Sequence, residues 1–204
     1  MDDPDTAPDW NHEISRVKAG DEAAARRLVE ALYPHVIRIV RSHLPRSEDE
    51  EDLAQDIFMK MFSKIHQFKN QQPFDHWVAR IALNTCYDRL RHQRSRPLFS
   101  FSDLSVEQSE FLEASLSNSS TPPPNTTTSG ELARELLQKL IETLKPREQI
   151  VIRLLDLEEH SVKETCELTG WGASKVKVTA MRARKKLTEA LQRLETKSLP
   201  SLAL

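Results

Sequence analysis

Basic side chains gather between Trp171 and Thr188, a segment with six basic residues and no acidic one. Wound into a helix at about 100° per residue, it has a cationic face, two flanks and an opposite apolar face. These sets are Lys175, Arg182 and Lys186 on the face, Lys177, Arg184 and Lys185 on the flanks, and Val176, Ala180, Ala183 and Leu187 on the apolar side. Such a helix fits the major groove of DNA, although a solvated charged face is the ordinary alternative.

The sequence around this segment predicts a helix-turn-helix. SVKETCELTG has the pattern of a short helix, WG that of a tight turn and ASKVKVTAMRARKKL that of a second helix. Gly170 suits the left-handed position after the first helix. The turn is therefore expected to aim the cationic helix at its ligand.

A second surface of this kind is predicted on a helix over residues 74–95. Arg80, Asn84 and Asp88 are four residues apart and share one face, with Arg91 beyond them. Asp88 is expected to orient one of the neighbouring arginines. Trp77 could stack on an unpaired base; as an alternative it is a core residue, which its spacing favours.

Four carboxylates, Asp49, Glu51, Asp52 and Asp56, open a helix predicted over residues 48–66, and Ser47 is a plausible N-cap. Acids at a helix N-terminus can simply offset the helix dipole. They can also form an acidic face that docks on a basic helical partner. Both interpretations remain open from the spacing alone.

Nothing in the sequence predicts catalysis. The carboxylates have no histidine partner or nucleophile at a useful spacing, and the seven histidines show no metal-binding pattern. Cys86 and Cys166 are expected to be small buried hydrophobes in a reducing cytoplasm. We therefore expect no enzymatic activity, no metal and no cofactor.

Charge is distributed unevenly along the 204 residues. The net charge is −2, yet residues 22–97 and 131–204 are each +3, while residues 1–21 and 98–130 are each −4. The near-neutral total thus conceals two basic blocks, which suit a nucleic-acid partner. No apolar stretch is long enough to cross a membrane, and the acidic N-terminus does not resemble a secretory signal, so we expect a cytoplasmic protein.

The elements that must position these residues are helices, because apolar residues recur at helical spacing and no strand pattern persists. Glycine, with four residues, is too scarce for folds built on glycine turns. A break or kink is expected at Pro34. We predict an all-α chain of two small helical domains: an acidic extension over 1–21, a domain over 22–97, a flexible Ser/Thr/Pro-rich linker over 98–130, a helix-turn-helix domain over 131–195 and a tail over 196–204.

Three segments together resemble bacterial RNA polymerase sigma factors. They are DEEDLAQDIFMKMF at 49–62, FDHWVARIALNTCYDRLR at 74–91 and LKPREQIVIRLLDLEEHSVKETCELTGWGASKVKVTAMRARKKL at 144–187. Their order, with a linker between the second and third, is similar to that of the extracytoplasmic-function group, which keeps only regions two and four of the sigma-70 family. The resemblance implies a subunit that directs transcription initiation and has no active site.

The resemblance also implies roles for particular residues. It assigns Asp49, Glu51, Asp52, Gln55 and Asp56 to the β′ coiled coil of core polymerase. It assigns the loop 67–73, with Lys69 and Asn70, to a flipped base of the minus-ten promoter element. It assigns Trp77, Arg80, Asn84, Asp88 and Arg91 to melting and holding that element. It assigns Ser174, Lys175, Lys177, Val178, Met181 and Arg182 to the minus-thirty-five element. The β flap of polymerase and an anti-sigma factor are further implied partners.

Two features depart from the pattern and leave the promoter preference open. Val178 and Thr179 stand where a small polar and a basic residue are usual, and Trp171 with Gly172 is bulkier than the usual turn. A stand-alone helix-turn-helix regulator is the alternative function, but it leaves the acidic helix and the 74–91 helix unexplained. A protein that only sequesters a partner is a further alternative, in which the basic residues would not be needed.

Overall fold

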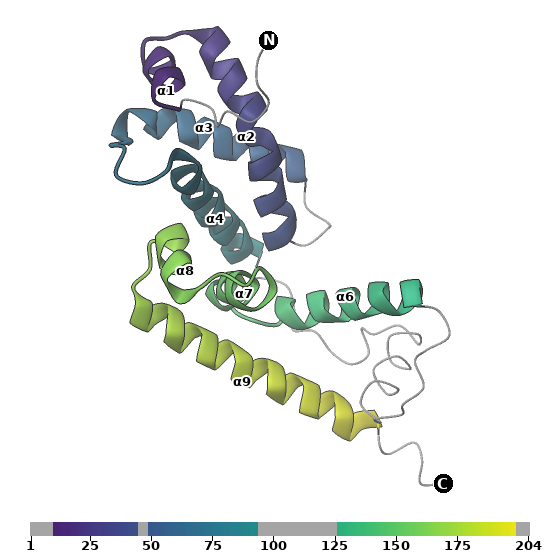
Figure 1. The fold of residues 1–204 in the computed structure, drawn as a ribbon. Coiled ribbons are helices and arrows are strands. Elements are labelled where there is room, and N and C mark those ends of the chain that lie inside the picture. Colours follow the sequence, from purple (N-terminus) through teal and green to yellow (C-terminus); the bar gives the residue numbers. More distant parts are fainter. Residues whose placement is uncertain (1–9, 45–48, 94–125, 199–204) are drawn as a thin grey trace, which may run out of the picture. The chain divides into compact units, whose positions relative to one another are not determined.

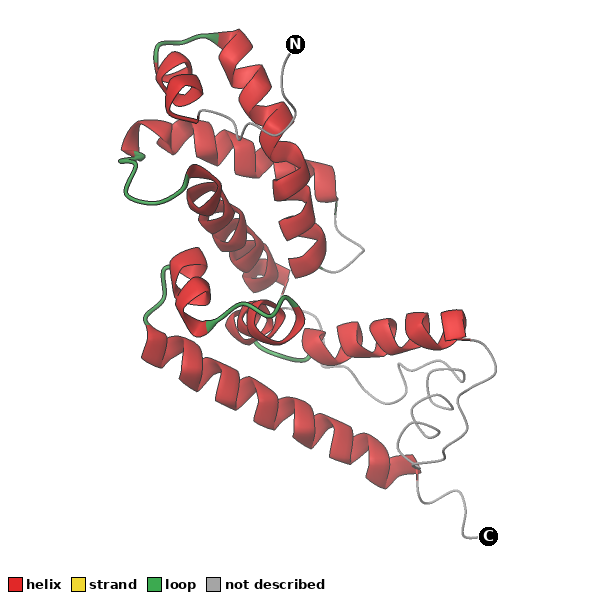
Figure 2. Cartoon of the chain, in the orientation of Figure 1, coloured by secondary structure: helices red, strands yellow, loops and turns green. Residues whose placement is uncertain are grey.

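The computed structural model describes residues 10–44, 49–93 and 126–198. Over these residues the ordered elements are helices, without a strand, as the sequence predicts (Figures 1 and 2). Along the chain the described helices form an N-terminal body, α1 to α4, and a C-terminal body, α6 to α9. No described helix is both long and apolar enough to cross a membrane.

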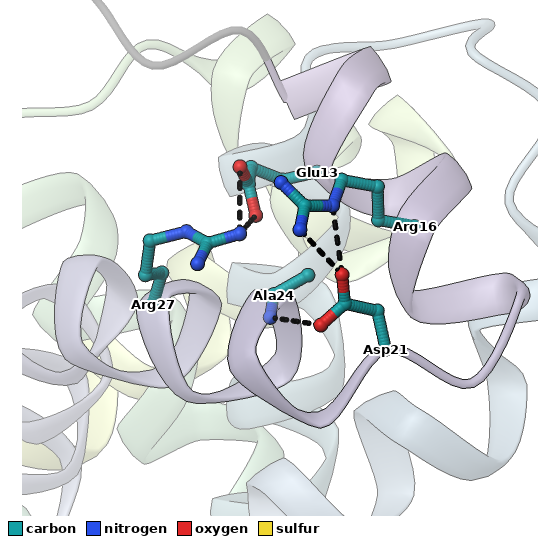
Figure 3. A network of polar contacts seen from close by, with 5 residues as sticks. All are labelled: Glu13, Arg16, Asp21, Ala24 and Arg27. Carbon is teal, nitrogen blue, oxygen red and sulfur yellow. Dashed lines mark hydrogen bonds and ion pairs between the residues drawn. The ribbon is translucent and has the colours of Figure 1, made fainter.

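The N-terminal body begins with a helix that the sequence analysis did not predict. Residues 1–21 were expected to form an acidic extension, whereas α1 (Trp10–Lys18) packs on α2 (Glu22–His43). Figure 3 shows the polar contacts behind this packing: Arg27 lies 3.0 Å from Glu13, and Arg16 lies 2.6 Å from Asp21. The Asp21 carboxylate also accepts a hydrogen bond from the Ala24 amide, which caps α2 and, with Arg16, lowers the pKa of Asp21.

Pro34 does not break α2, which continues from Glu22 to His43 around it. The expected break is therefore wrong. The helix is held by its buried side, since Leu28, Leu32, Val36 and Val40 are at most 1% exposed. Burial of such a stripe outweighs the one backbone hydrogen bond that proline removes, because each large apolar side chain contributes about 1.5–3 kcal/mol.

The other helices of this body lie close to their predicted positions. They are α3 (Glu50–Lys64), the 3-10 helix η1 (Ile65–Gln67) and α4 (Phe74–Gln93). The N-cap of α3 is Asp49, whose side chain accepts hydrogen bonds from the amides of Glu51 and Asp52. Ser47, the predicted N-cap, lies outside the described residues. Lys60 of α3 donates to the hydroxyl of Thr85 on α4 at 3.3 Å and links the two helices.

The C-terminal body contains α6 (Thr126–Glu142), α7 (Pro146–Ile152), a π-helical turn η3 (Arg153–Leu157), α8 (Val162–Thr169) and α9 (Ala173–Ser198). Helix α6 starts four residues before the predicted end of the linker at 130, and residues 98–125 lie outside the described residues. As predicted, Pro146 occupies the first turn of α7, where its missing N–H costs nothing.

Helices α6, α7 and α9 form the core of this body. Ile141, Leu144, Ile152 and Ala183 are buried together, with Leu187 packed against them. The side-chain amide of buried Gln149 donates to the carbonyl of Leu144 at 3.0 Å, just beyond the end of α6. This contact provides a donor for a backbone carbonyl near a helix end. The core thus fixes α9 by its apolar side.

Candidate nucleic-acid interface

Helix α9 has a packed side and an exposed side. Val176, Ala180 and Ala183 are at most 3% exposed, whereas Val178 is 41% and Met181 64% exposed. At 100° per residue Val178 and Met181 lie almost opposite the packed residues. The six residues predicted to contact the minus-thirty-five element, Ser174, Lys175, Lys177, Val178, Met181 and Arg182, are all exposed.

Three of the six basic residues between Trp171 and Thr188 pair with carboxylates inside the C-terminal body. Lys186 lies 2.6 Å from Glu148 of α7, which is 6% exposed. Arg184 makes a bidentate contact with Asp156, and this hydrogen bond raises the pKa of Arg184. Lys185 lies 3.8 Å from Glu189. The sequence groups Lys186 with Lys175 and Arg182 on one cationic face, and of these three residues Lys186 is the one whose ammonium is held by Glu148.

Lys175, Lys177 and Arg182 remain on the exposed side. Within the described part of the chain no ion pair is formed by Lys177 or Arg182, and Lys175 lies over the ring of Trp171, 5.0 Å from its centroid. The charge at the exposed side of α9 is therefore smaller than the sequence count, and it surrounds two apolar side chains, Val178 and Met181.

Helix α8 and the turn before α9 are shaped by a capping box and a glycine. The Ser161 hydroxyl accepts a hydrogen bond from the Glu164 amide, and the Glu164 carboxylate accepts one from the Ser161 amide, a capping box at the start of α8. Gly170 has a φ of 71°, the left-handed conformation predicted for it. Three residues, 170–172, then separate α8 from α9. This geometry agrees with the predicted helix-turn-helix.

Helix α4 also has one exposed side. Arg80, Asn84, Asp88 and Arg91 are exposed and lie within roughly 80° of one another around the helix. Val78, Ala82 and Cys86, on the other side, are fully buried. Burial raises the pKa of the Cys86 thiol to about 12, since an apolar environment disfavours the thiolate.

Trp77 lies at the N-terminal end of this face and is half-buried. Its ring stacks on Phe74 at 5.6 Å and packs against Phe68 at 5.4 Å between centroids. Trp77 therefore packs against core residues, as the core interpretation predicts, while part of the residue stays accessible.

A pocket of about 350 Å³ opens beside this aromatic cluster. The loop after η1 forms one wall, and Asn70, with φ 54°, makes the sharp turn there that an Asn tolerates. The lining residues are Trp10, Asn11, Phe68, Asn70, Gln72, Pro73 and Phe74. Trp10 and Asn11 come from α1, which the sequence analysis did not predict. Their only signal in the sequence was an aromatic residue followed by polar ones at the end of an acidic segment.

The polar residues at the start of α3 include one that caps the helix and several that are exposed. Asp49 caps the helix, and Asp52, Gln55 and Asp56 lie on the exposed side. Met59, which the sequence analysis did not single out, lies among them and is 66% exposed. No group of acidic, histidine or cysteine side chains in the described ranges could hold a metal ion.

Comparison with known proteins agrees with these two bodies. Residues 28–96 match the family model for sigma-70 region 2, and residues 134–187 match that for sigma-70 region 4. The ECF RNA polymerase sigma-E factor of Escherichia coli K12 is 29% identical over 181 residues, 89% of this chain and 93% of that protein. The RNA polymerase sigma-H factor of Pseudomonas aeruginosa is 24% identical over the same shares.

A solved structure, CnrH in complex with the cytosolic domain of CnrY, shares the fold with a TM-score of 0.51 at 22% identity, covering 89% of this chain and 96% of that one. A helical body matching region 2 and a helix-turn-helix body matching region 4 define a promoter-specificity subunit. The chain belongs to the sigma-70 family of RNA polymerase sigma factors, in its ECF group. It therefore binds core polymerase and promoter DNA to direct transcription initiation, while the polymerase supplies the catalysis.

Proposed function

We propose that this sigma factor binds core polymerase, the minus-ten element and the minus-thirty-five element through three exposed surfaces, on α3, on α4 with the loop 67–73, and on α9. One observation carries this proposal. The cations of α9 separate into those paired inside the fold, such as Lys186, and those left beside exposed Val178 and Met181. A helix that only solvated its charges would have no need of two exposed apolar side chains at the centre of its cationic side.

For the minus-thirty-five element, α9 enters the major groove with Ser174, Lys175, Lys177, Val178, Met181 and Arg182 facing DNA. Arg182 can contact base edges through paired hydrogen bonds, and Val178 can contact a thymine methyl group. The exposed fractions of Val178 and Met181 support this assignment.

For the minus-ten element, the loop 67–73 and α4 hold single-stranded DNA. A base leaving the duplex loses a few kcal/mol of stacking, which a pocket and a cationic face must offset. The pocket lined by Trp10, Asn70 and Phe74 offers aromatic rings and amide groups for such a base. Lys69 directly precedes Asn70 in the chain. Trp77, Arg80, Asn84, Asp88 and Arg91 hold the strand along α4.

For core polymerase, α3 presents Glu51, Asp52, Gln55 and Asp56 to the β′ coiled coil, and exposed Met59 adds an apolar contact. Asp49 acts at this surface mainly by capping α3. The β flap is the partner proposed for the C-terminal body, and the factor acts in the cytoplasm, where an anti-sigma factor restrains it. The complex of CnrH with CnrY supports this last point only by likeness of fold.

Charge reversal on α9 tests the central assignment. Holoenzyme carrying Lys177→Glu and Arg182→Glu is expected to lose promoter binding by at least tenfold, measured by filter binding or fluorescence anisotropy. Lys185→Glu, on the same helix, is the matched control and is expected to have a much smaller effect, because Lys185 neighbours Glu189. Equal loss in both variants, or no loss in either, contradicts the assignment.

A further inference from the structure

The turn of the helix-turn-helix holds a group of residues that the assignment above does not use. Trp171 lies between the two helices, with Arg147 of α7 5.6 Å from its ring centroid and Lys175 of α9 5.0 Å from it. Three elements of the C-terminal body therefore meet at one indole ring. Trp171 is also the residue by which this turn departs from the usual aliphatic one.

Both cations are exposed, and both lie against the same ring. Two distances to one centroid place their charged groups no more than about 11 Å apart, close to the Debye length at moderate salt. Each cation is attracted to the ring, but the two cations repel each other. An anion that reached both would remove this repulsion, so the arrangement favours a negatively charged ligand.

The chemistry of the group suits a DNA phosphate better than a base edge. Arginine, lysine and the indole N–H are all donors and offer no acceptor, which matches phosphate oxygens, whereas base edges present both donors and acceptors. In helix-turn-helix proteins the parts next to the recognition helix contact the DNA backbone. The group is continuous with the exposed side of α9 through Lys175.

We propose that Arg147, Trp171 and Lys175 form a phosphate clamp that fixes α9 on the DNA backbone at the edge of the upstream promoter element. Trp171 is the positioning residue, because it holds the two cations, and Arg147 and Lys175 bind the phosphate. This inference rests on the proposed role of α9. It moves Lys175 from reading bases to contacting the backbone and adds Arg147, which lies outside the predicted surface.

Affinity and its salt dependence test the clamp. Holoenzyme of core polymerase with the full chain is titrated with a promoter duplex selected by the wild-type protein, and with the same duplex after its upstream element is scrambled. Arg147→Ala and Lys175→Ala are each expected to weaken binding to both duplexes by the same factor. The two changes together are expected to reduce the slope of log K against log salt by about 0.9, the value for one phosphate contact, and each single change by part of this.

Trp171 variants separate positioning from charge. Trp171→Leu, which restores the usual aliphatic turn, is expected to weaken binding about fivefold, and Trp171→Phe, which keeps a ring, about twofold. Arg134→Ala, an exposed cation of α6, is the control and is expected to change neither affinity nor slope. Thermal unfolding of each variant separates loss of binding from loss of fold.

Three results would overturn the clamp. One is that Arg147→Ala and Trp171→Leu leave affinity and slope unchanged while Lys177→Ala and Arg182→Ala still weaken binding, which leaves the role of α9 intact. Another is that Arg147→Ala weakens only the unscrambled duplex, which makes Arg147 a base reader. The third is that it weakens assembly with core polymerase, which makes the group a contact for an acidic protein surface. If Lys177→Ala and Arg182→Ala also have no effect, the proposed function itself fails.

Discussion

At the scale of single residues, the sequence supplied the types of the charged side chains but not their partners. Lys175 and Lys186 lie about 20° apart in a helical projection, yet only Lys186 meets a buried carboxylate. That carboxylate, Glu148, lies 38 positions earlier in the chain, and no local sequence pattern predicts such a pairing. The apolar side of α9 was predictable because Val176, Ala180 and Ala183 recur at helical spacing.

The pair of Lys186 and Glu148 is expected to stabilise the C-terminal body. The Glu148 carboxylate also accepts a hydrogen bond from the Lys145 amide at 2.8 Å. Lys186→Met removes the ammonium that pairs with this buried carboxylate and should lower the free energy of unfolding by about 2 kcal/mol. Lys185→Met, at a side chain that is 79% exposed, should change it by less than about 0.5 kcal/mol. Urea unfolding followed by circular dichroism measures both, and equal effects would contradict the structural role of Lys186.

The two cysteines are expected to differ in reactivity. Cys86 is fully buried and its pKa is raised to about 12, so near pH 8 it is almost entirely the unreactive thiol. Cys166 is only half-buried. In the folded protein iodoacetamide should alkylate Cys166 at least tenfold faster, and mass spectrometry of the digested protein gives the two rates. Faster labelling of Cys86 would show that α4 opens readily.

At the scale of elements, helix types and approximate positions were predictable from the sequence, because long apolar stripes have a clear period. The predicted helix over 48–66 covers α3 and all but the last residue of η1, and the predicted 74–95 contains α4. What failed depended on contacts outside the segment concerned. Helix α1 is short and acidic at its start, and its ion pairs with α2, such as Glu13 with Arg27, are long-range information.

The N-cap of α3 separates stability from binding at the acidic surface. Asp49→Ala removes the acceptor for two helix amides and is expected to lower the free energy of unfolding by about 1 kcal/mol. Asp52→Ala and Asp56→Ala are expected to weaken binding to core polymerase more than Asp49→Ala does, with a smaller loss of stability. Thermal melts compare the stability of the three variants, and pull-down with core polymerase compares their binding. The reverse ranking would show that Asp49 contributes mainly to binding.

At the scale of the whole molecule, the chain joins two bodies that are each only modestly basic, with a net charge of +3 over residues 22–97 and over 131–204. Each alone should bind DNA weakly. Core polymerase that holds both bodies turns the second contact into an intramolecular one, which raises the overall affinity without new contacts. The small net charge of the full chain is therefore compatible with promoter binding, because each of the two bodies contributes its own positive charge at a separate site on one promoter.

The most direct test of this account is transcription in vitro by core polymerase and the full chain on a library of promoters with randomised upstream and minus-ten positions. The account predicts transcripts from defined start sites, with sequence preferences at two elements separated by a fixed spacing. It also predicts that Lys177→Glu with Arg182→Glu removes the upstream preference first. Active core polymerase that yields no specific start sites with the wild-type chain would contradict the central claim.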